Sequence, residues 1–395
     1  MKNLQLIKEA LVATVIALLL TYIISFIPFK FEFVKVIKQG SLDMDIYDLY
    51  YSGRGGQNVK RDPNIVLVQV AADRASIARQ VTIINGHQPA LIGLDVIFSQ
   101  AKDAESDTAL VRAIDGAKNI VLSTSITDDL VMKKNFFDST GKKYASGFTN
   151  FAGARYSVVR EYAPFVQLND QQYFAFTSRI VEVFSPIHFT KLKRRNNRIE
   201  IINYSGNLGN YTSITADELL QYQSSGQLSE ILKGKIVLLG FFVKQPPLVI
   251  EDLYFSPLNE VVAGKSNPDI YGLVIHANIL SMILSEDYVH LASAFFSYAC
   301  AFVLTFLMML YILKQYSKPK HPAHWKLLLV QLLIIILLFY LFLQIYNWFQ
   351  FKMPISPVII SLVIGLEWLG VYKSAALFLN RKRHYKTIFN NAHGI

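Results

Sequence analysis

The sequence predicts an α/β domain with a mostly parallel core sheet, joined to a bundle of four transmembrane helices. Three observations predict this fold class. Of the 395 residues, 52% are hydrophobic and only 17% are charged, a composition typical of integral membrane proteins. Four apolar runs reach the length of about 20 residues that crosses a bilayer. Between the first two runs, short apolar segments alternate with helical patterns, which is typical of parallel sheets.

The first apolar run covers residues 10–29 and follows residues 1–9, which carry Lys2 and Lys8. A cleaved signal peptide is the alternative, because a basic start before an apolar core is typical of both. The run is long for a signal peptide, and residues 24–28 offer no convincing small-x-small cleavage site. We therefore expect an uncleaved first span.

Residues 30–288 contain no further span and should form the α/β domain. The expected buried strands are the apolar or β-branched runs at residues 65–70, 90–97, 119–124 and 235–240. Helices are expected between them, at residues 74–85 and 103–116. The stretch at residues 127–204 is aromatic, polar and rich in turn residues, and so predicts added antiparallel strands or hairpins rather than another βα unit.

Three more spans are expected at residues 291–313, 327–349 and 355–379. Their flanks differ in charge: the connection at residues 314–326 carries four lysines, residues 350–354 carry only Lys352, and the tail at residues 380–395 is basic. Because basic residues gather at the cytoplasmic ends of spans, we expect residues 1–9, 314–326 and 380–395 in the cytoplasm. The large domain should then lie in the periplasm or outside the cell, with both termini inside.

The distribution of charge and the single cysteine argue against a nucleic-acid-binding protein and against a domain stabilised by disulfides. The formal net charge of +10 comes largely from basic residues beside the apolar runs, so we expect the lipid bilayer and no nucleic acid as a partner. Cys300 is the only cysteine and lies inside an apolar run, so no disulfide can form within one chain. The outer domain must therefore be stabilised by its own core.

From about Asp45 to Leu284 the sequence resembles the type-2 CHASE domain family, through short motifs that stand in the order of the family. They are DIYDL at residues 45–49, DPNIVLV at 62–68, IGLDVIFS at 92–99, NYSG at 203–206, ADELL at 216–220, LKGKIVLLG at 232–240, Asp252 with Ser256 and Pro257, and YGLVIHAN at 271–278.

This resemblance implies a sensory extracellular domain of the kind associated with bacterial cyclases and histidine kinases, with one span before the domain and about three after it. It also implies a location in the bacterial cytoplasmic (inner) membrane. Members commonly continue into a cytoplasmic output domain, whereas only a short basic tail follows the last apolar run here. We therefore expect a separate cytoplasmic effector as the partner.

Four residues are candidates for ligand binding or signal relay. Asp95 ends an apolar strand, at the edge where ligands bind in open α/β sheets. The alternative for Asp95 is a cap that orders the following loop. Asp252, His276 and Asn278 flank the strand at residues 235–240 and could converge with Asp95. A carboxylate beside His276 would raise the pKa of the imidazole and could make a pH-sensitive latch near the membrane. The alternative is a hydrogen-bonded structural histidine.

Glu367 lies well inside the run at residues 355–379, where an ionisable side chain is costly unless it faces protein or water. Its candidate partners are Gln331, Gln344 and Lys373. One interpretation is a hydrogen-bonded residue that joins helices, and another is a role in signalling. Transport is a third interpretation and rests on Glu367 alone.

Catalytic and metal motifs do not occur. The sequence contains neither Gly-x-Ser-x-Gly nor His-Glu-x-x-His, and its histidines lack the spacing of metal ligands. We expect no enzyme, no metal and no cofactor.

Two functions remain in view. The first is a receptor or sensor that detects an unknown extracytoplasmic ligand or protein and signals through the transmembrane bundle. The alternative is an envelope scaffold or assembly protein that does not signal. In either case the sequence allows the chain to form a homo-oligomer but does not decide whether it does.

Overall fold

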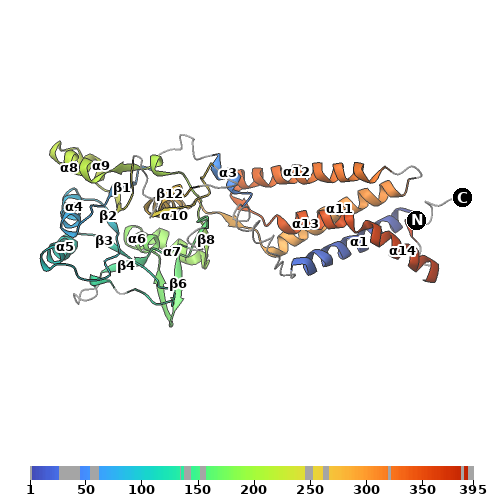
Figure 1. The fold of residues 1–395 in the computed structure, drawn as a ribbon, viewed down its shortest axis with the longest axis horizontal. Helices are drawn as coiled ribbons and strands as arrows, with labels where there is room; N and C mark the ends of the chain where they lie inside the picture. The colour runs from blue at the N-terminus through green and yellow to red at the C-terminus, as the bar shows by residue number, and fades with distance from the viewer. Residues whose placement is uncertain are drawn as a thin grey trace. The chain divides into compact units, whose positions relative to one another are not determined.

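The computed structural model describes residues 2–25, 45–53, 62–133, 135–137, 144–151, 157–244, 252–260, 267–318, 322–383 and 387–389. The chain divides into two compact units (Figure 1). The α/β unit comprises Ile37–Val289, and the helical unit comprises Met1–Val36 and His290–Ile395.

A six-stranded sheet with the order β4-β3-β2-β10-β1-β9 forms the centre of the α/β unit, and all its neighbouring strands are parallel. The strands are β1 (Ile65–Gln69), β2 (Leu91–Asp95), β3 (Ile120–Thr124), β4 (Ala145–Phe148), β9 (Thr212–Ile214) and β10 (Ile236–Gly240). The four predicted apolar runs form β1, β2, β3 and β10. The prediction of a mostly parallel core sheet is therefore confirmed.

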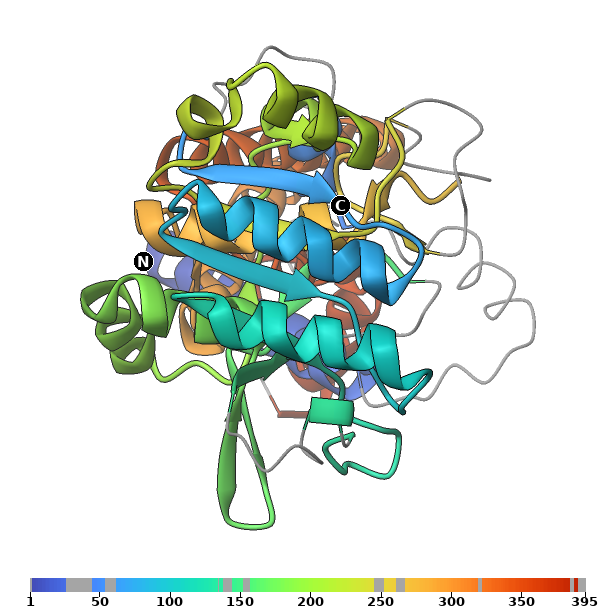
Figure 2. The same cartoon turned by 90° about the vertical axis from the view of Figure 1, so that its left-hand side faces the viewer.

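One face of the sheet is covered by α4 (Arg74–Gly86), α5 (Ala104–Gly116), α8 (Ala216–Ser224) and α9 (Leu228–Leu232). Figure 2 shows α4 and α5 lying in front of the strands. Both begin where an aspartate caps the first turn: Asp73 accepts a hydrogen bond from the Ser76 amide and Asp103 from the Ser106 amide. The apolar sides of these helices bury Val66, Val68 and their neighbours in one core cluster.

The opposite face of the sheet packs against α6 (Phe176–Phe184) and α10 (Gly272–Ser285). Glycines in the strands allow this close packing. A Cβ atom at Gly93 would lie 2.8 Å from Ile180 Cδ1 of α6. Because Gly93 carries no side chain, α6 can approach the sheet closely at this point.

The prediction for residues 127–204 is right in one part and wrong in another. The antiparallel pair of β6 (Phe165–Leu168) and β7 (Gln171–Phe174) is the expected hairpin, and β5 (Glu161–Tyr162) pairs with β8 (Glu200–Ile201). However, the same stretch also forms α6 and α7 (Pro186–Arg195). The β-branched and aromatic residues of α6 favour strands intrinsically, but packing against the sheet overrides that preference.

Short elements complete the α/β unit. They are α3 (Asp48–Ser52), the 3-10 turn η2 (Leu208–Asn210), and the antiparallel strands β11 (Leu253–Tyr254) and β12 (Ile270–Tyr271).

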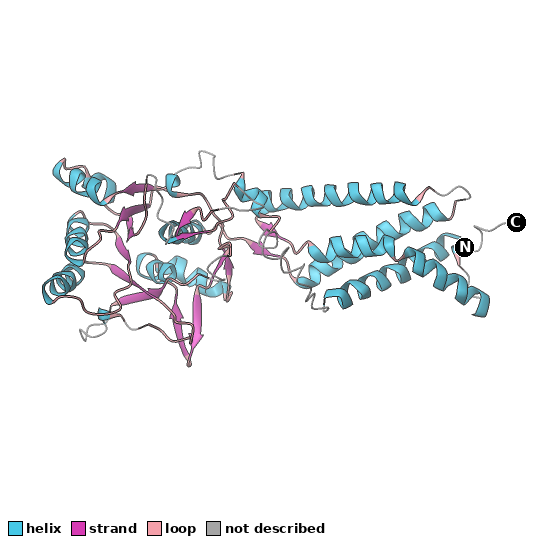
Figure 3. Ribbon diagram, viewed as in Figure 1, coloured by secondary structure: helices cyan, strands magenta, loops and turns pink. Residues whose placement is uncertain are grey.

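The described part of the helical unit is almost entirely helical (Figure 3). It contains α1 (Lys2–Ser25), α11 (Ala294–Tyr316), α12 (His324–Phe349), α13 (Ser356–Glu367) and α14 (Leu369–Arg383), with a short parallel pair of β13 (His290–Leu291) and β14 (Phe351–Lys352). Three helices, with candidate spans Asn3–Ile23, Ala294–Tyr316 and His324–Phe349, are long and apolar enough to cross a membrane. The apolar helices indicate a membrane protein.

The expected fourth span at residues 355–379 is not one straight helix. Its residues form α13 and α14, which are bent by 51° relative to each other at Trp368. The count is therefore three helices long enough to span, or four if the bent pair crosses as one. Of the expected first span, residues 26–29 lie outside the described residues.

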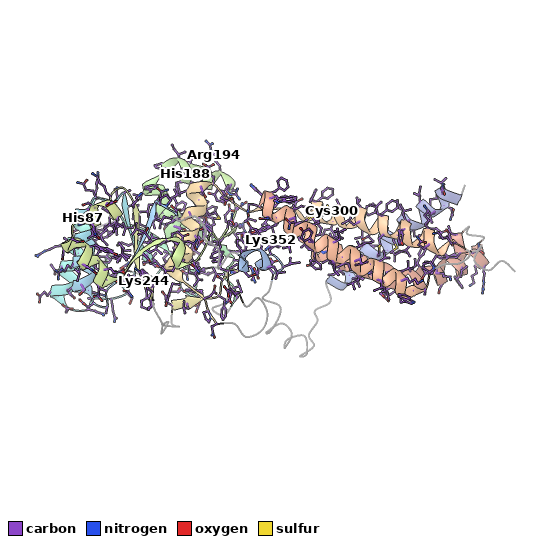
Figure 4. The ribbon with its side chains drawn as sticks, turned by 90° about the horizontal axis from the view of Figure 1, so that it is seen from above. His87, His188, Arg194, Lys244, Cys300 and Lys352 are labelled. Carbon is purple, nitrogen blue, oxygen red and sulfur yellow. The ribbon has the colours of Figure 1, made fainter. Side chains whose placement is uncertain are left out.

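Small and polar side chains join the helices within the helical unit. Thr305 Oγ1 of α11 lies 2.9 Å from Ser361 Oγ of α13, and both side chains are buried. Gly365 leaves room for Met309, whose Cε atom would lie 2.5 Å from a Cβ atom at that position. Small residues and hydrogen bonds between helices are typical of packing in membranes. Cys300 lies on α11 as a free thiol (Figure 4).

Candidate functional site

Asp95 is the last residue of β2, at the carboxyl edge of the sheet. In the parallel register it lies beside Gly240 of β10, and Gly240 lies beside Gln69 of β1. The carboxyl ends of three neighbouring strands therefore meet at one place, which is where open α/β sheets bind ligands. The side chain of Asp95 keeps 18% of its surface exposed, so it is largely but not completely buried.

His276 approaches this edge from α10. Its Nε2 atom lies 3.9 Å from Asp95 Oδ2, which is too far for a hydrogen bond, and the two groups would form an ion pair only if the imidazole were protonated. Gly240 makes the approach feasible, because a Cβ atom there would lie 2.6 Å from Leu273 Cδ1 of α10 and 3.1 Å from Asp95 Cβ. The structure thus brings together Asp95 and His276, which are far apart in the sequence.

Aromatic rings enclose the imidazole. The centre of the Phe151 ring lies 4.8 Å from the centre of the His276 ring, and the centre of the Phe176 ring lies 5.4 Å from it. His276 is 4% exposed, and its Nδ1 atom is buried with no hydrogen-bond partner among the described residues. This burial lowers the pKa of His276 to about 3. The expectation that a neighbouring carboxylate raises this pKa is therefore wrong, because loss of hydration penalises the charged imidazole and lowers its pKa.

The carboxyl groups, rather than the imidazole, respond to pH near neutrality. Burial raises the pKa of Asp95 to about 7, and the negative charge of Asp252 adds to this shift. Burial also raises the pKa of Asp252 to about 6. The site thus combines a neutral imidazole with two carboxyls that gain or lose a proton between pH 6 and 7.

Asn278 does not join this cluster. It is fully buried, and its Oδ1 atom accepts hydrogen bonds from the Ser205 amide (2.8 Å), the Ser205 hydroxyl (3.0 Å) and the Gly206 amide (3.2 Å). Its Nδ2 atom donates to the carbonyl oxygens of Gly206 and Val274, each at 2.9 Å. Both polar atoms of the side-chain amide form hydrogen bonds, so Asn278 attaches the loop that follows β8 to helix α10.

Two residues that support the site were missed by sequence analysis. Phe151 covers the imidazole and also contacts the ring of Tyr254, at 5.2 Å. Asp269 accepts hydrogen bonds from the amide (2.8 Å) and the hydroxyl (2.5 Å) of Ser256, which fixes the turn after β11. The aromatic content of residues 127–204 was the only signal for Phe151, and Asp269 had no signal beyond its place before an apolar pair.

Glu367 belongs to the helical unit, at the end of α13. Its side chain is exposed at the end of α13 and makes no hydrogen bond or ion pair with the described residues. Gln331, one of its expected partners, is buried and donates instead to the carbonyl oxygen of Leu362, at 3.1 Å. Among the described residues no group of three or more potential ligands could hold a metal ion.

Comparison with known proteins gives one result. The family model of the CHASE2 domain matches residues 14–313. No curated protein and no solved structure matches the chain.

Proposed function

The chain belongs to the CHASE2 domain family, a family of sensory extracellular domains, and from this we propose that it is a bacterial membrane sensor. In this proposal the α/β unit lies outside the cytoplasm and responds to an extracytoplasmic stimulus at the Asp95–His276 edge. The helical unit passes the response to a separate cytoplasmic protein.

One observation carries the proposal: the helix that holds His276 leads in the chain to the first apolar helix after the α/β unit. His276 lies on α10, which ends at Ser285, and α11 begins at Ala294. Nearly every residue of α10 is buried, so the helix is held firmly against the sheet. A displacement of α10 at the site therefore acts on the short segment that leads to α11.

The Asp95–His276 edge can also exist in two states. With Asp95 protonated, the pair is neutral, whereas an ionised Asp95 places a charge beside a buried, aromatic-lined imidazole. A stimulus shifts the packing only if it binds one of two states better than the other. A proton or a ligand that contacts Asp95 meets this requirement.

A photo-crosslinking amino acid at Trp325 tests the proposal. Trp325 is 58% exposed and lies in the basic connection that we expect in the cytoplasm. Illumination of native membranes should capture one cytoplasmic protein. The yield should change in the Asp95→Asn variant, because that variant removes the ionisable group. Asp128→Asn is the matched control, since Asp128 is exposed in the same unit.

Two results would count against the sensor. No captured protein at all would exclude a partner at this connection. A captured protein whose yield is identical in the parent and in Asp95→Asn, with a stable complex in detergent, would favour the assembly role instead.

A further inference from the structure

A cavity of about 290 Å³ lies in the α/β unit, apart from the Asp95–His276 edge. Its walls come from the end of β3, from β4, from β7 and from the segment around Asn135. The volume is near the lower end of small-molecule sites, which run from about 300 to 1,000 Å³. The cavity is therefore suited to a small ligand.

The charge of the lining is one-sided. Lys133 and Arg179 line the cavity, and none of its lining residues is an aspartate or a glutamate. The side chain of Lys133 is exposed and forms no ion pair with the described residues. Glu182, which lies outside the lining, partly balances the charge of Arg179, so Lys133 supplies the unbalanced positive charge that favours a small anion over a cation.

Arg179 is held in place before any ligand arrives. Its Nε atom donates to the carbonyl oxygen of Ser146 at 3.2 Å, Nη1 pairs with Glu182, and the guanidinium lies 4.8 Å from the centre of the Phe174 ring. Nη2 makes no hydrogen bond with the described residues. A guanidinium fixed in this way can bind a carboxylate with little loss of side-chain entropy.

The remaining lining is partly polar and partly aromatic. Phe137, Tyr144, Tyr173 and Phe174 contribute aromatic side chains. Several polar groups of the wall are already satisfied: the Tyr173 hydroxyl donates to Gln171 Oε1 at 3.0 Å, and Thr124 Oγ1 donates to the Lys133 carbonyl oxygen at 3.0 Å. A ligand with a flat apolar body and one acidic group complements such a wall.

We propose that this cavity is a binding site for a small carboxylate with a flat, unsaturated body. Arg179 and Lys133 bind the carboxylate, and the aromatic side chains pack against the body. If the protein is a sensor as proposed above, this ligand class is a second input, separate from the stimulus at the Asp95–His276 edge. The binding itself does not depend on that function and is measured without any signalling partner.

Isothermal titration of the full-length protein in detergent tests the site, with benzoate as the probe and benzamide as its neutral counterpart. Benzoate should bind saturably, and benzamide about tenfold more weakly, since it lacks the charge that both cations recognise. Benzoate affinity should also fall as the salt concentration rises.

Two substitutions assign the binding to this cavity. Arg179→Gln should weaken benzoate binding about tenfold, the effect of losing a charged hydrogen bond. Because Arg179 also contacts Ser146 and Glu182, the exposed Lys133→Gln is the variant that leaves the fold intact, and we expect about a threefold loss from it. Arg194→Gln is the control, since Arg194 is an exposed residue of α7 outside the lining (Figure 4).

The proposal is overturned if benzoate does not bind the parent protein. It is also overturned if benzoate binds saturably but neither Arg179→Gln nor Lys133→Gln weakens the binding. Binding that both variants weaken supports the site even if crosslinking at Trp325 captures no partner, so the site and the sensor function fail separately.

Discussion

At the scale of single residues, burial decides the chemistry of the Asp95–His276 edge. Phe151 and Phe176 remove water from the imidazole, which makes its charged form costly and lowers its pKa to about 3. The same burial makes the ionised form of Asp95 costly and raises its pKa to about 7. The proton at this site is therefore held by the carboxyl group and not by the ring.

This assignment predicts how stability depends on pH. The pKa of Asp95 rises from 3.8 to about 7 in the folded protein, so the folded state binds the proton more tightly. The resulting stabilisation is complete below about pH 4 and is lost as the pH rises through 7. Asp95→Asn removes this dependence. At pH 8 the variant should be more stable than the parent by about 1–3 kcal/mol, and at pH 4 the two should be nearly equal.

Hydrogen exchange of β10 in urea, on the full-length protein in detergent, measures this difference within the α/β unit. Tryptophan fluorescence would not, because Trp325, Trp348 and Trp368 all lie in the helical unit. Asp128→Asn is the control and should show no such pH-dependent difference. A variant less stable than the parent at pH 8 would mean that Asp95 is stabilising as a charged group.

Asn278 yields a second prediction at this scale. Asn278→Ala leaves the half-buried amide of Ser205 and the buried amide of Gly206 without their acceptor. The variant should lose about 2–4 kcal/mol of stability, since each unpaired buried group costs about 1–3 kcal/mol. Gln223→Ala, an exposed change on α8, is the control. Resistance of the full-length protein to limited proteolysis in urea gives the comparison, and equal resistance of the two variants would refute the role of Asn278.

The candidate site was only partly predictable from the sequence. Asp95 was recognised because the end of a buried strand can be read from an apolar run. The pairing with His276 followed from the expected topology, but the direction of the histidine pKa shift did not. It depends on Phe151, whose approach to α10 is fixed by tertiary packing. Asn278 was grouped with His276 although residues two positions apart on a helix point to different sides, which the sequence alone can show.

At the scale of elements, three glycines test how closely the helices pack on the sheet. A Cβ atom at Gly147 would lie 2.7 Å from the backbone of Ala175 and Phe176, which cannot move without shifting α6. At Gly93 the obstructing atoms are the ends of the Ile180 and Leu238 side chains, at 2.8 Å. Gly116, at the end of α5, has no atom within 4 Å.

Alanine substitutions at these three glycines should therefore change the stability of the protein to different degrees, in a fixed order. Gly147→Ala should destabilise the protein by about 3 kcal/mol or more, and Gly93→Ala by about 1–3 kcal/mol, because side chains can yield where backbone cannot. Gly116→Ala should be neutral or gain up to about 1 kcal/mol, since it only restricts the unfolded chain. Urea unfolding followed by exchange of β10 ranks the three, and a destabilising Gly116→Ala would contradict the packing described here.

The strands of the sheet were the most predictable elements. β1 and β10 are buried on both faces, so their sequences are continuous apolar runs that end at turn residues. α6 was not predicted, because its β-branched and aromatic composition favours a strand, although its buried Phe176, Ile180 and Val181 recur at helical spacing. The bend at Trp368 was missed because average hydropathy does not reveal a break within an apolar run.

At the scale of the whole molecule, a buried carboxylate joins the two ends of the described chain within the helical unit. Glu9 of α1 accepts hydrogen bonds from Thr387 Oγ1 (3.1 Å) and from the Ile388 amide (2.9 Å). The next residue, Phe389, is 2% exposed and packs against the ring of Tyr372. The segment at residues 387–389 is thereby anchored to α1.

Removal of this anchor should free the segment. Glu9→Ala should make the chain after α14 at least about tenfold more sensitive to protease in detergent, because losing two hydrogen bonds to a buried carboxylate costs about 2 kcal/mol or more. Glu105→Ala is the control, since Glu105 is exposed on α5. Equal cleavage rates in both variants would show that Glu9 does not hold the segment.

The proposed sensor function requires that the α/β unit face away from the cytoplasm and that the basic connection at residues 314–326 face into it. Single cysteines at two exposed positions, introduced in a Cys300→Ala background, test this most directly: Asp128→Cys in the α/β unit and Lys318→Cys after α11. In bacterial spheroplasts, a membrane-impermeant maleimide should label Asp128→Cys at once and Lys318→Cys only after the membrane is permeabilised. Labelling of Lys318→Cys in sealed spheroplasts, with Asp128→Cys protected, would show that the chain has the opposite orientation in the membrane.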